Sequence, residues 1–171
     1  MSARLHPWPP GPWRILGRGV RRGPAKVLAV ASSGGHWVEL LRLQRAFEGH
    51  DVAYATVSAG CRVDVPTARF HVLPDVTRWE PRAIPGCLRS VVSVLAAERP
   101  DVVVSTGALP GLLALTAARA LGIRTLWLDS LANAERLSGS GQAARFVADL
   151  WLTQWPDLAR PSGPQHLGAV L

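Results

Sequence analysis

Residues 26–36, which read KVLAVASSGGH, are the stretch that decides the fold. The apolar run 27–31 is typical of a buried strand, and the two glycines that follow allow the backbone to turn sharply. After the turn, Trp37, Leu40 and Phe47 recur near helical spacing. The stretch therefore predicts a strand, a tight turn and a helix, the first unit of a parallel α/β sheet.

The same alternation of short β-branched runs and longer helical segments continues to the end of the chain. Expected strands cover residues 26–31, 51–57, 69–73, 101–105, 124–129 and 150–154. Expected helices cover residues 37–47, 82–98, 111–121 and 142–148. The fold class that follows is α/β, a Rossmann-like parallel sheet with helices on both faces.

The length of 171 residues fits one domain, which we place at residues 25–171. Hydrophobic residues make up 48% and charged residues 18%, so the composition is that of a folded enzyme domain. The most apolar stretch, 102–118, is interrupted by Gly107 and Pro110 and is too broken for a membrane-spanning helix. We expect a cytoplasmic protein without a transmembrane anchor.

Residues 1–24 are rich in proline, glycine, arginine and tryptophan, contain no acidic residue and show no periodicity. They predict a flexible tail. Two interpretations stay open at this point: a segment that rests on an anionic membrane surface, and a disordered leader. The net charge of +7 favours anionic partners such as phospholipid head groups and pyrophosphates.

Two other classes of partner find little support in the sequence. The arginines within the fold are interspersed with acids and form no aromatic platform, so no specific nucleic-acid site is expected. Cys61 and Cys87 lie far apart and outside any ligand-like spacing. We therefore expect no metal site and no cofactor.

The loop after the first strand is the leading candidate for a binding site. Ser33, Gly34 and Gly35 open a helix, where exposed N–H groups and the helix dipole suit an oxyanion or a pyrophosphate. The loop lacks the lysine of a Walker loop and does not match G-x-G-x-x-G, which argues against an ATPase and a dinucleotide dehydrogenase. A plain tight turn remains the alternative.

His36 stands at the junction of this loop and the helix. The dipole there favours a neutral imidazole, which can accept a proton as a general base. Glu39 follows one turn later as a second catalytic candidate, but an acid near a helix start is also favourable for capping. Both interpretations of Glu39 stay open.

Two further polar segments follow later strands. Thr106 and Gly107 follow the strand expected at residues 101–105, and Asp129 and Ser130 end the one expected at residues 124–129. Because the carboxyl ends of parallel strands share one edge of a sheet, we expect these residues to share a cleft with the first loop, where the Asp129 carboxylate can bind a sugar hydroxyl or act as a base. Turn and cap roles are the alternatives, and residues 137–141 are expected to form a simple turn.

Several segments match one family in order: Ser33–His36, Glu39–Leu43, Ser105–Gly107, Asp129–Ser130, Leu137–Ser138, Ala148–Asp149, Thr153–Leu158 and Gly168–Leu171. Together they resemble the bacterial PssD-like polysaccharide proteins. They are also similar to the membrane subunit of the two-chain N-acetylglucosaminyltransferase of eukaryotes. The resemblance spans residues 26–171. Departures from the family pattern are Asp129, where Glu is common, and Asn133, where Arg is common.

The resemblance implies the N-terminal, acceptor-binding half of a GT-B glycosyltransferase, similar to that of MurG. The half that binds most of the sugar nucleotide would come from a PssE-like catalytic chain, and this chain would be inactive without it. By the same resemblance Gly34, Gly35 and His36 face the acceptor, and Gln154 and Trp155 help to hold the partner. The full set expected to bind the acceptor or its diphosphate is Ser33, Gly34, Gly35, Thr106, Gly107, Asp129 and Ser130.

The function implied is a hexosyl transfer from a nucleotide-diphospho-sugar, most simply a UDP-sugar, to a polyprenyl-diphosphate-linked acceptor in exopolysaccharide or capsule biosynthesis. PssD-like proteins suggest glucuronic acid as the sugar transferred. The enzyme would sit peripherally on the inner face of the plasma membrane. The alternative is a non-catalytic membrane scaffold that recruits a catalytic PssE-like partner.

Overall fold

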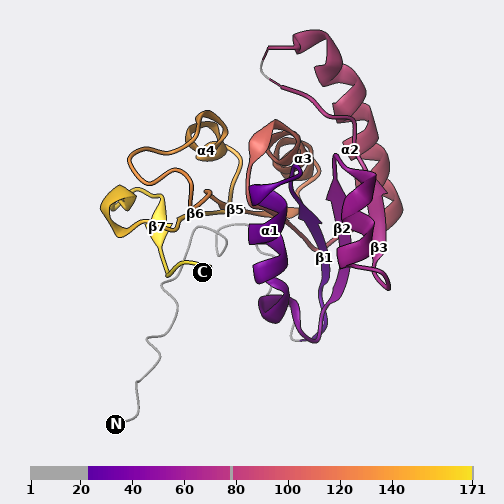
Figure 1. Cartoon of the computed structure of the whole chain (residues 1–171), viewed down its shortest axis with the longest axis horizontal. Coiled ribbons are helices and arrows are strands. Elements are labelled where there is room, and N and C mark those ends of the chain that lie inside the picture. Colours follow the sequence, from indigo (N-terminus) through magenta and orange to yellow (C-terminus); the bar gives the residue numbers. More distant parts are fainter. Residues whose placement is uncertain (1–22, 78, 171) are drawn as a thin grey trace.

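The computed structural model describes residues 23–77 and 79–170, and these build a seven-stranded parallel sheet (Figure 1). The strand order is β3-β2-β1-β4-β5-β6-β7. The strands are β1 (Lys26–Val30), β2 (Asp51–Thr56), β3 (Arg69–Val72), β4 (Val102–Ser105), β5 (Arg124–Leu128), β6 (Leu150–Thr153) and β7 (Gln165–His166). The α/β class expected from the sequence is confirmed.

Helices and short 3-10 turns connect the strands. The α-helices are α1 (Gly35–Arg42), α2 (Ile84–Glu98), α3 (Ala108–Ala120) and α4 (Gly139–Ala144). The 3-10 turns are η2 (Gln44–Phe47), η3 (Ala59–Asp64), η4 (Pro81–Ala83) and η5 (Pro156–Leu158).

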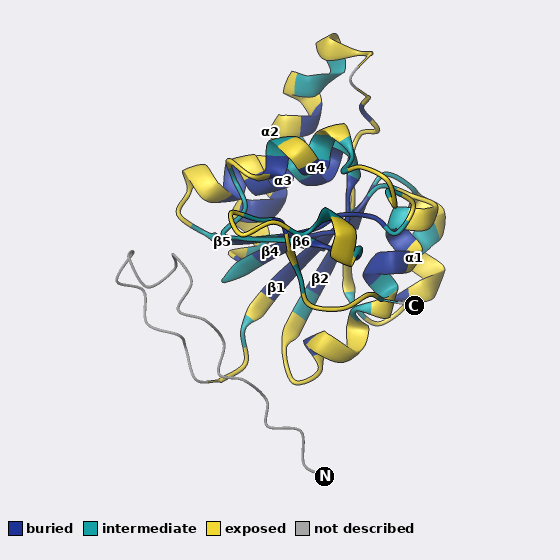
Figure 2. Cartoon of the chain, turned by 90° about the vertical axis from the view of Figure 1, so that its left-hand side faces the viewer, coloured by how far each residue is buried: buried dark blue, intermediate teal, exposed yellow. Residues whose placement is uncertain are grey.

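The hydrophobic core lies on both faces of the sheet because side chains alternate along each strand. On β1, Leu28 and Val30 join the cluster formed with α2, α3 and α4, which lie above the sheet in Figure 2. Val27 and Ala29 join the opposite cluster, which contains Trp37 of α1. Helices therefore cover both faces, as the sequence indicated.

The strand order reverses between β1 and β4, which are neighbours in the sheet. Helix α1 leaves β1 toward one face, and α3 leaves β4 toward the other. Diverging connections of this kind open a crevice at the carboxyl ends of the two strands. The residues that follow these strands, 31–34 and 106–107, lie at that crevice.

Several element boundaries differ from the expectations. Helix α1 already ends at Arg42, and its expected last turn is the separate η2. Helix α3 begins at Ala108 rather than residue 111, because Pro110 is tolerated in the first turn of a helix. Helix α4 begins at Gly139 instead of residue 142. Strand β7 was not expected, since two residues carry no alternating pattern.

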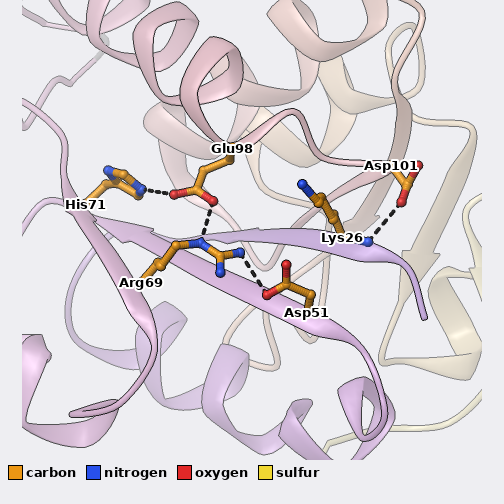
Figure 3. A network of polar contacts seen from close by, with 6 residues as sticks. All are labelled: Lys26, Asp51, Arg69, His71, Glu98 and Asp101. Carbon is orange, nitrogen blue, oxygen red and sulfur yellow. Dashed lines mark hydrogen bonds and ion pairs between the residues drawn. The ribbon is translucent and has the colours of Figure 1, made fainter.

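Charged side chains join the elements at the opposite, amino-terminal edge of the sheet (Figure 3). The Glu98 carboxylate at the end of α2 accepts from Arg69 Nε at 2.7 Å and contacts His71 Nε2 at 2.6 Å, both on β3. Arg69 also donates to Asp51 of β2 at 2.8 Å. The network therefore fastens α2 to the edge of the sheet that β3 forms.

The structure bears on the expected tail and on the expected lack of a transmembrane helix. The tail expected at residues 1–24 lies outside the described residues except for its last two. Within residues 23–77 and 79–170, no helix has the length and apolar character needed to cross a bilayer.

Candidate functional site

A cavity of about 530 Å³ opens at the carboxyl ends of the central strands. Its lining comes from the starts of α1, α3 and α4 and from the loop between β5 and α4. The lining residues are His36, Ala108, Ser130, Ala132, Asn133, Ser138, Gly139 and Ser140. The cavity lies at the crevice where the strand order reverses, the usual place for a ligand in such sheets.

His36, the second residue of α1, packs directly against the loop after β4. A Cβ added to Gly107 would lie 2.5 Å from both Nδ1 and Cε1 of the imidazole, so only a glycine leaves room for the ring. Gly107 also has a φ of 147°, a conformation that suits glycine. Thr106 Oγ1 donates to the His36 carbonyl oxygen at 2.7 Å. The two glycine loops therefore lie side by side, but Thr106 and Gly107 are buried and do not line the cavity.

The imidazole keeps one polar atom without a partner. His36 Nδ1 is buried and forms no hydrogen bond with the protein. Nearly all buried polar side-chain atoms in native proteins are hydrogen-bonded, so this exception marks the imidazole as a candidate functional group. Because Nδ1 packs against Gly107, only the rest of the ring can face the cavity.

The two helix starts beside His36 carry no side-chain cap. Gly34 precedes α1 and Gly107 precedes α3, and neither position offers a side-chain acceptor to the free N–H groups of the first turn. Ala108 lies in the cavity wall with a φ of 63°, a strained conformation for a residue with a side chain. Such N-termini favour oxyanions, as the sequence suggested for Gly34 and Gly35.

Asp129 is not exposed to the cavity. Its side chain is 1% exposed, and its carboxylate accepts hydrogen bonds from Trp127 Nε1, Asn133 Nδ2 and both the backbone N–H and the hydroxyl of Ser138. All its donors are internal, so the carboxylate holds the loop that forms the cavity wall. The expectation that Asp129 contacts the acceptor therefore has no geometric support.

Ser138 does more than form the simple turn expected at residues 137–141. Its hydroxyl accepts from Gly141 N at 2.8 Å and so caps α4, while it donates to Asp129 Oδ1 at 2.7 Å. A Cβ on Gly141 would collide with the Asp129 carboxylate. A glycine at this position lets α4 approach the end of β5.

Glu39 is a buried structural acceptor in this arrangement. It is 6% exposed and accepts from Ser130 Oγ at 2.6 Å, Leu131 N at 3.2 Å and Gln154 Nε2 at 3.0 Å. Helix α1 has no acidic residue in its first turn, so Glu39 does not cap it either. The carboxylate connects α1 to the cavity wall and to the end of β6.

The remaining candidates are two serines expected to bind the acceptor and two residues expected to hold the partner. Ser130 lines the cavity, whereas Ser33 is exposed at the start of α1. Gln154 is 2% exposed and therefore presents no surface to a partner chain, contrary to the expectation. Trp155 is half-buried, and its Nε1 donates to the Leu131 carbonyl oxygen at 2.9 Å.

Ala132, Asn133 and Ser140 line the cavity but were not among the candidates for binding. Ala132 and Asn133 lie in the irregular loop between β5 and α4, which has no motif of its own, and Ser140 lies in the first turn of α4. The signal that identifies them is positional: this segment follows a strand whose carboxyl end faces the crevice.

Comparisons with known proteins bear on the family and the fold of the chain. No model of a known protein family matches the chain. The chain is 31% identical over 192 residues to the UDP-N-acetylglucosamine transferase subunit ALG14 of Eremothecium gossypii, covering 92% of this chain and 86% of that protein.

Solved structures share the fold. The crystal structure of MurG from Acinetobacter baumannii matches with a TM-score of 0.72 and 18% identity over 86% of this chain. The UDP-GlcNAc 2-epimerase of Neisseria meningitidis, solved with UDP-GlcNAc, matches with a TM-score of 0.59 and 12% identity over 77% of this chain. The chain spans 46% and 41% of these two proteins, less than half of each.

The likeness to MurG confirms the expected fold, the Rossmann-like N-terminal half of a GT-B glycosyltransferase. At these identities the solved structures establish the fold alone. The curated relative is close enough to establish the family. The chain belongs to the glycosyltransferase family of the UDP-N-acetylglucosamine transferase subunit ALG14.

Proposed function

We propose that this chain is the acceptor-binding subunit of a split glycosyltransferase. It would transfer a sugar from a UDP-sugar to a polyprenyl-diphosphate-linked acceptor, in a PssD-like role in exopolysaccharide or capsule assembly. The observation that carries the proposal is the position of His36, whose imidazole lines the cavity beside two uncapped helix N-termini. The imidazole can accept a proton from a hydroxyl, and the two helix N-termini attract a diphosphate.

The chemistry is an inverting displacement. The acceptor hydroxyl oxygen bonds to the anomeric carbon of the donor while the bond from that carbon to the UDP oxygen breaks, and UDP leaves with the electron pair. His36 takes the hydroxyl proton as the new bond forms. The N–H groups at the starts of α1 and α3 neutralise the acceptor diphosphate and hold its hydroxyl near the imidazole.

A second chain would supply most of the nucleotide-sugar site. The curated relative is itself a transferase subunit, and this chain covers 86% of it. We propose a PssE-like catalytic chain as the partner, held by the surface around Trp155. Because Asp129, Glu39 and Gln154 are buried and internally bonded, we assign them to positioning rather than to contact with the substrate or partner.

Co-expression with a PssE-like chain tests the proposal. Transfer of radiolabelled sugar to membrane lipid is measured for both chains together and for each alone, first with UDP-N-acetylglucosamine, suggested by the relative's name, and then with UDP-glucuronic acid. We expect transfer only with both chains. No complex and no transfer with either donor would overturn the proposal.

Removal of the imidazole separates an enzyme subunit from a scaffold. His36→Ala should lower kcat by a factor of about 10²–10⁴ if His36 is the general base. His50→Gln is the matched control, since His50 accepts from Ala25 N away from the cavity. Full activity of His36→Ala with the partner bound would favour the non-catalytic scaffold.

We also propose that the subunit binds the inner face of the plasma membrane through α2. Trp79 is 77% exposed just before α2, and Val92 (45%) and Leu88 (37%) lie one turn apart on it. Arg82 and Arg89 are exposed beside them. The start of α2 follows the carboxyl edge of the sheet, where the cavity opens, and this end of the helix projects beyond the rest of the chain in Figure 1. An apolar face with flanking cations suits an anionic membrane surface.

Vesicle sedimentation tests this surface. Leu88→Ser with Val92→Ser should weaken binding to phosphatidylglycerol vesicles, and rising salt should weaken binding of the unchanged chain. Leu121→Ser is the control, because Leu121 is 57% exposed at the far end of α3. Equal binding by the double variant and the control would refute a role for α2.

A further inference from the structure

The side chain of Gln154 uses all of its main hydrogen-bonding groups inside the protein. Its Nε2 donates to Glu39 Oε2 and to the Asp129 carbonyl oxygen, both at 3.0 Å, and its Oε1 accepts from Val170 N at 2.9 Å. A primary amide has two N–H groups and one oxygen, so this one orientation satisfies the group. Turning the amide over would place its oxygen against two acceptors.

Each partner of Gln154 belongs to a different part of the cavity wall or its support. Glu39 lies in α1, one turn after His36, and its other oxygen binds Ser130 and Leu131. Asp129 holds Ser138 at the start of α4. The amide therefore bridges the helix that carries His36 and the loop that forms the facing wall.

The third partner is a surface segment that contributes nothing to the lining of the cavity. Residues 167–170 follow β7. Both the backbone N–H and the backbone carbonyl oxygen of Val170 form hydrogen bonds with side chains. Its N–H donates to Gln154, and its carbonyl oxygen accepts from Arg42 Nη1 at 2.9 Å. Leu167 of this segment is 58% exposed. The segment thus lies at the surface while one of its amides reaches a buried group.

We infer that Gln154 is a positioning residue that couples the placement of residues 167–170 to the geometry of the His36 cavity. Withdrawal of Val170 leaves Oε1 as a buried acceptor without a partner, which is unfavourable. Any rotation that finds Oε1 a new donor breaks the bonds to Glu39 or Asp129. Movement at the surface segment is thereby transmitted to both walls of the cavity.

The inference deepens the proposed function and rests on it in one respect. A partner subunit that contacts residues 167–170 would change the position of the imidazole without touching it, and an acceptor that orders the cavity would strengthen partner binding by the same factor. The physical coupling itself requires no transfer activity, so it can be measured separately.

Two substitutions isolate the coupling. Val170→Pro removes the one N–H that binds Gln154 and substitutes no residue that lines the cavity. Ala169→Pro is the matched control, with the same ring one residue earlier. Gln154→Glu retains the shape but sets a carboxylate against two acceptor oxygens.

The experiment is NMR of the full chain with labelled histidine, with His36 assigned by the loss of its signals in His36→Gln. We expect Val170→Pro and Gln154→Glu to shift the His36 imidazole signals, while His50 and His71 at the other edge of the sheet stay unchanged and serve as references. Ala169→Pro should leave His36 unchanged. If Gln154→Glu does not fold, Val170→Pro decides.

Transfer kinetics with the partner chain complete the test. Val170→Pro should lower kcat by about tenfold with little change in the KM for the donor, because a misplaced base costs rate rather than donor binding. Unchanged His36 signals and unchanged kcat in folded Val170→Pro would overturn the coupling. Shifted His36 signals in a chain that shows no transfer with any partner would leave the coupling intact and remove the proposed function.

Discussion

At the residue scale, the site depends on how closely His36 and Gly107 pack. The imidazole lies where a side chain at residue 107 would be, and Gly107 has a backbone conformation that other residues adopt only with strain. Both constraints act on the same position. The position of the proposed base therefore depends both on α1, which carries His36, and on the lack of a side chain at Gly107.

Gly107→Ala should displace the imidazole and destabilise the fold by about 1–3 kcal/mol, through strain at a positive φ and the collision with the ring. Sugar transfer should fall with it. Urea unfolding and transfer assays measure the two effects. Gly86→Ala is the control: its added Cβ meets nothing within 4 Å, and a helical Gly→Ala change should stabilise by about 0.4–1 kcal/mol. Equal stability of the two variants would contradict the packing argument.

At the element scale, the two edges of the sheet have different tasks. The carboxyl edge carries uncapped helix starts and a cavity, whereas the amino edge is closed by ion pairs such as those of Glu98. Partial burial acts to raise the pKa of Glu98, but the hydrogen bonds from His71 and Arg69 and their charges outweigh it and lower the pKa below its usual range. The ionised carboxylate thus stabilises the junction of α2 and β3.

Glu98→Gln should lower the free energy of unfolding at pH 7 by about 1–3 kcal/mol, since it leaves the charges of Arg69 and His71 with a weaker partner. Because the folded pKa of Glu98 is depressed, its contribution is fully present above the pKa of the unfolded chain and is lost as the pH falls through the folded value. The difference between the variant and the unchanged chain should therefore shrink in acid.

Urea unfolding at several pH values measures this difference. Asp51→Asn is the milder comparison, because Asp51 is 45% exposed and exposed ion pairs contribute only about 0–1 kcal/mol. A Glu98→Gln effect that stays constant from neutral to acid pH would argue against a contribution from the ionised carboxylate.

At the scale of the whole molecule, the core on one face of the sheet closes over Cys87 of α2. This thiol is 0% exposed, and burial, with a smaller contribution from Asp75, raises its pKa above the usual range. Cys61 is half-buried on the other face. The two thiols therefore report different events, local access at Cys61 and opening of the core at Cys87.

Iodoacetamide should modify Cys61 in the native chain and reach Cys87 only when the core opens. Addition of urea below the unfolding midpoint should accelerate the reaction of Cys87 in proportion to the unfolded fraction. Mass spectrometry of each thiol-containing peptide follows the two rates, and Cys61→Ser simplifies the measurement. Rapid modification of Cys87 without denaturant would show that the core is not closed.

The sequence by itself determined the α/β class, the expected strands, the two glycine loops and the candidate His36. These depend on local signals: apolar runs, glycine turns and the rule that carboxyl ends of parallel strands share an edge. The resemblance added the GT-B family, which the relative and the solved fold support. Boundaries such as the start of α3 were missed because Pro110 fits a first helical turn as well as a loop.

Only the tertiary structure decided which polar residues are accessible and which are internal. Glu39, Asp129 and Gln154 are polar residues near glycine loops or strand ends, and the sequence made them candidates for catalysis, acceptor binding and partner binding, in that order. In the fold they bind one another's segments across separations of up to 115 residues. Hydrogen bonds between positions so far apart depend on the packing of whole elements, and no local pattern in the chain encodes them.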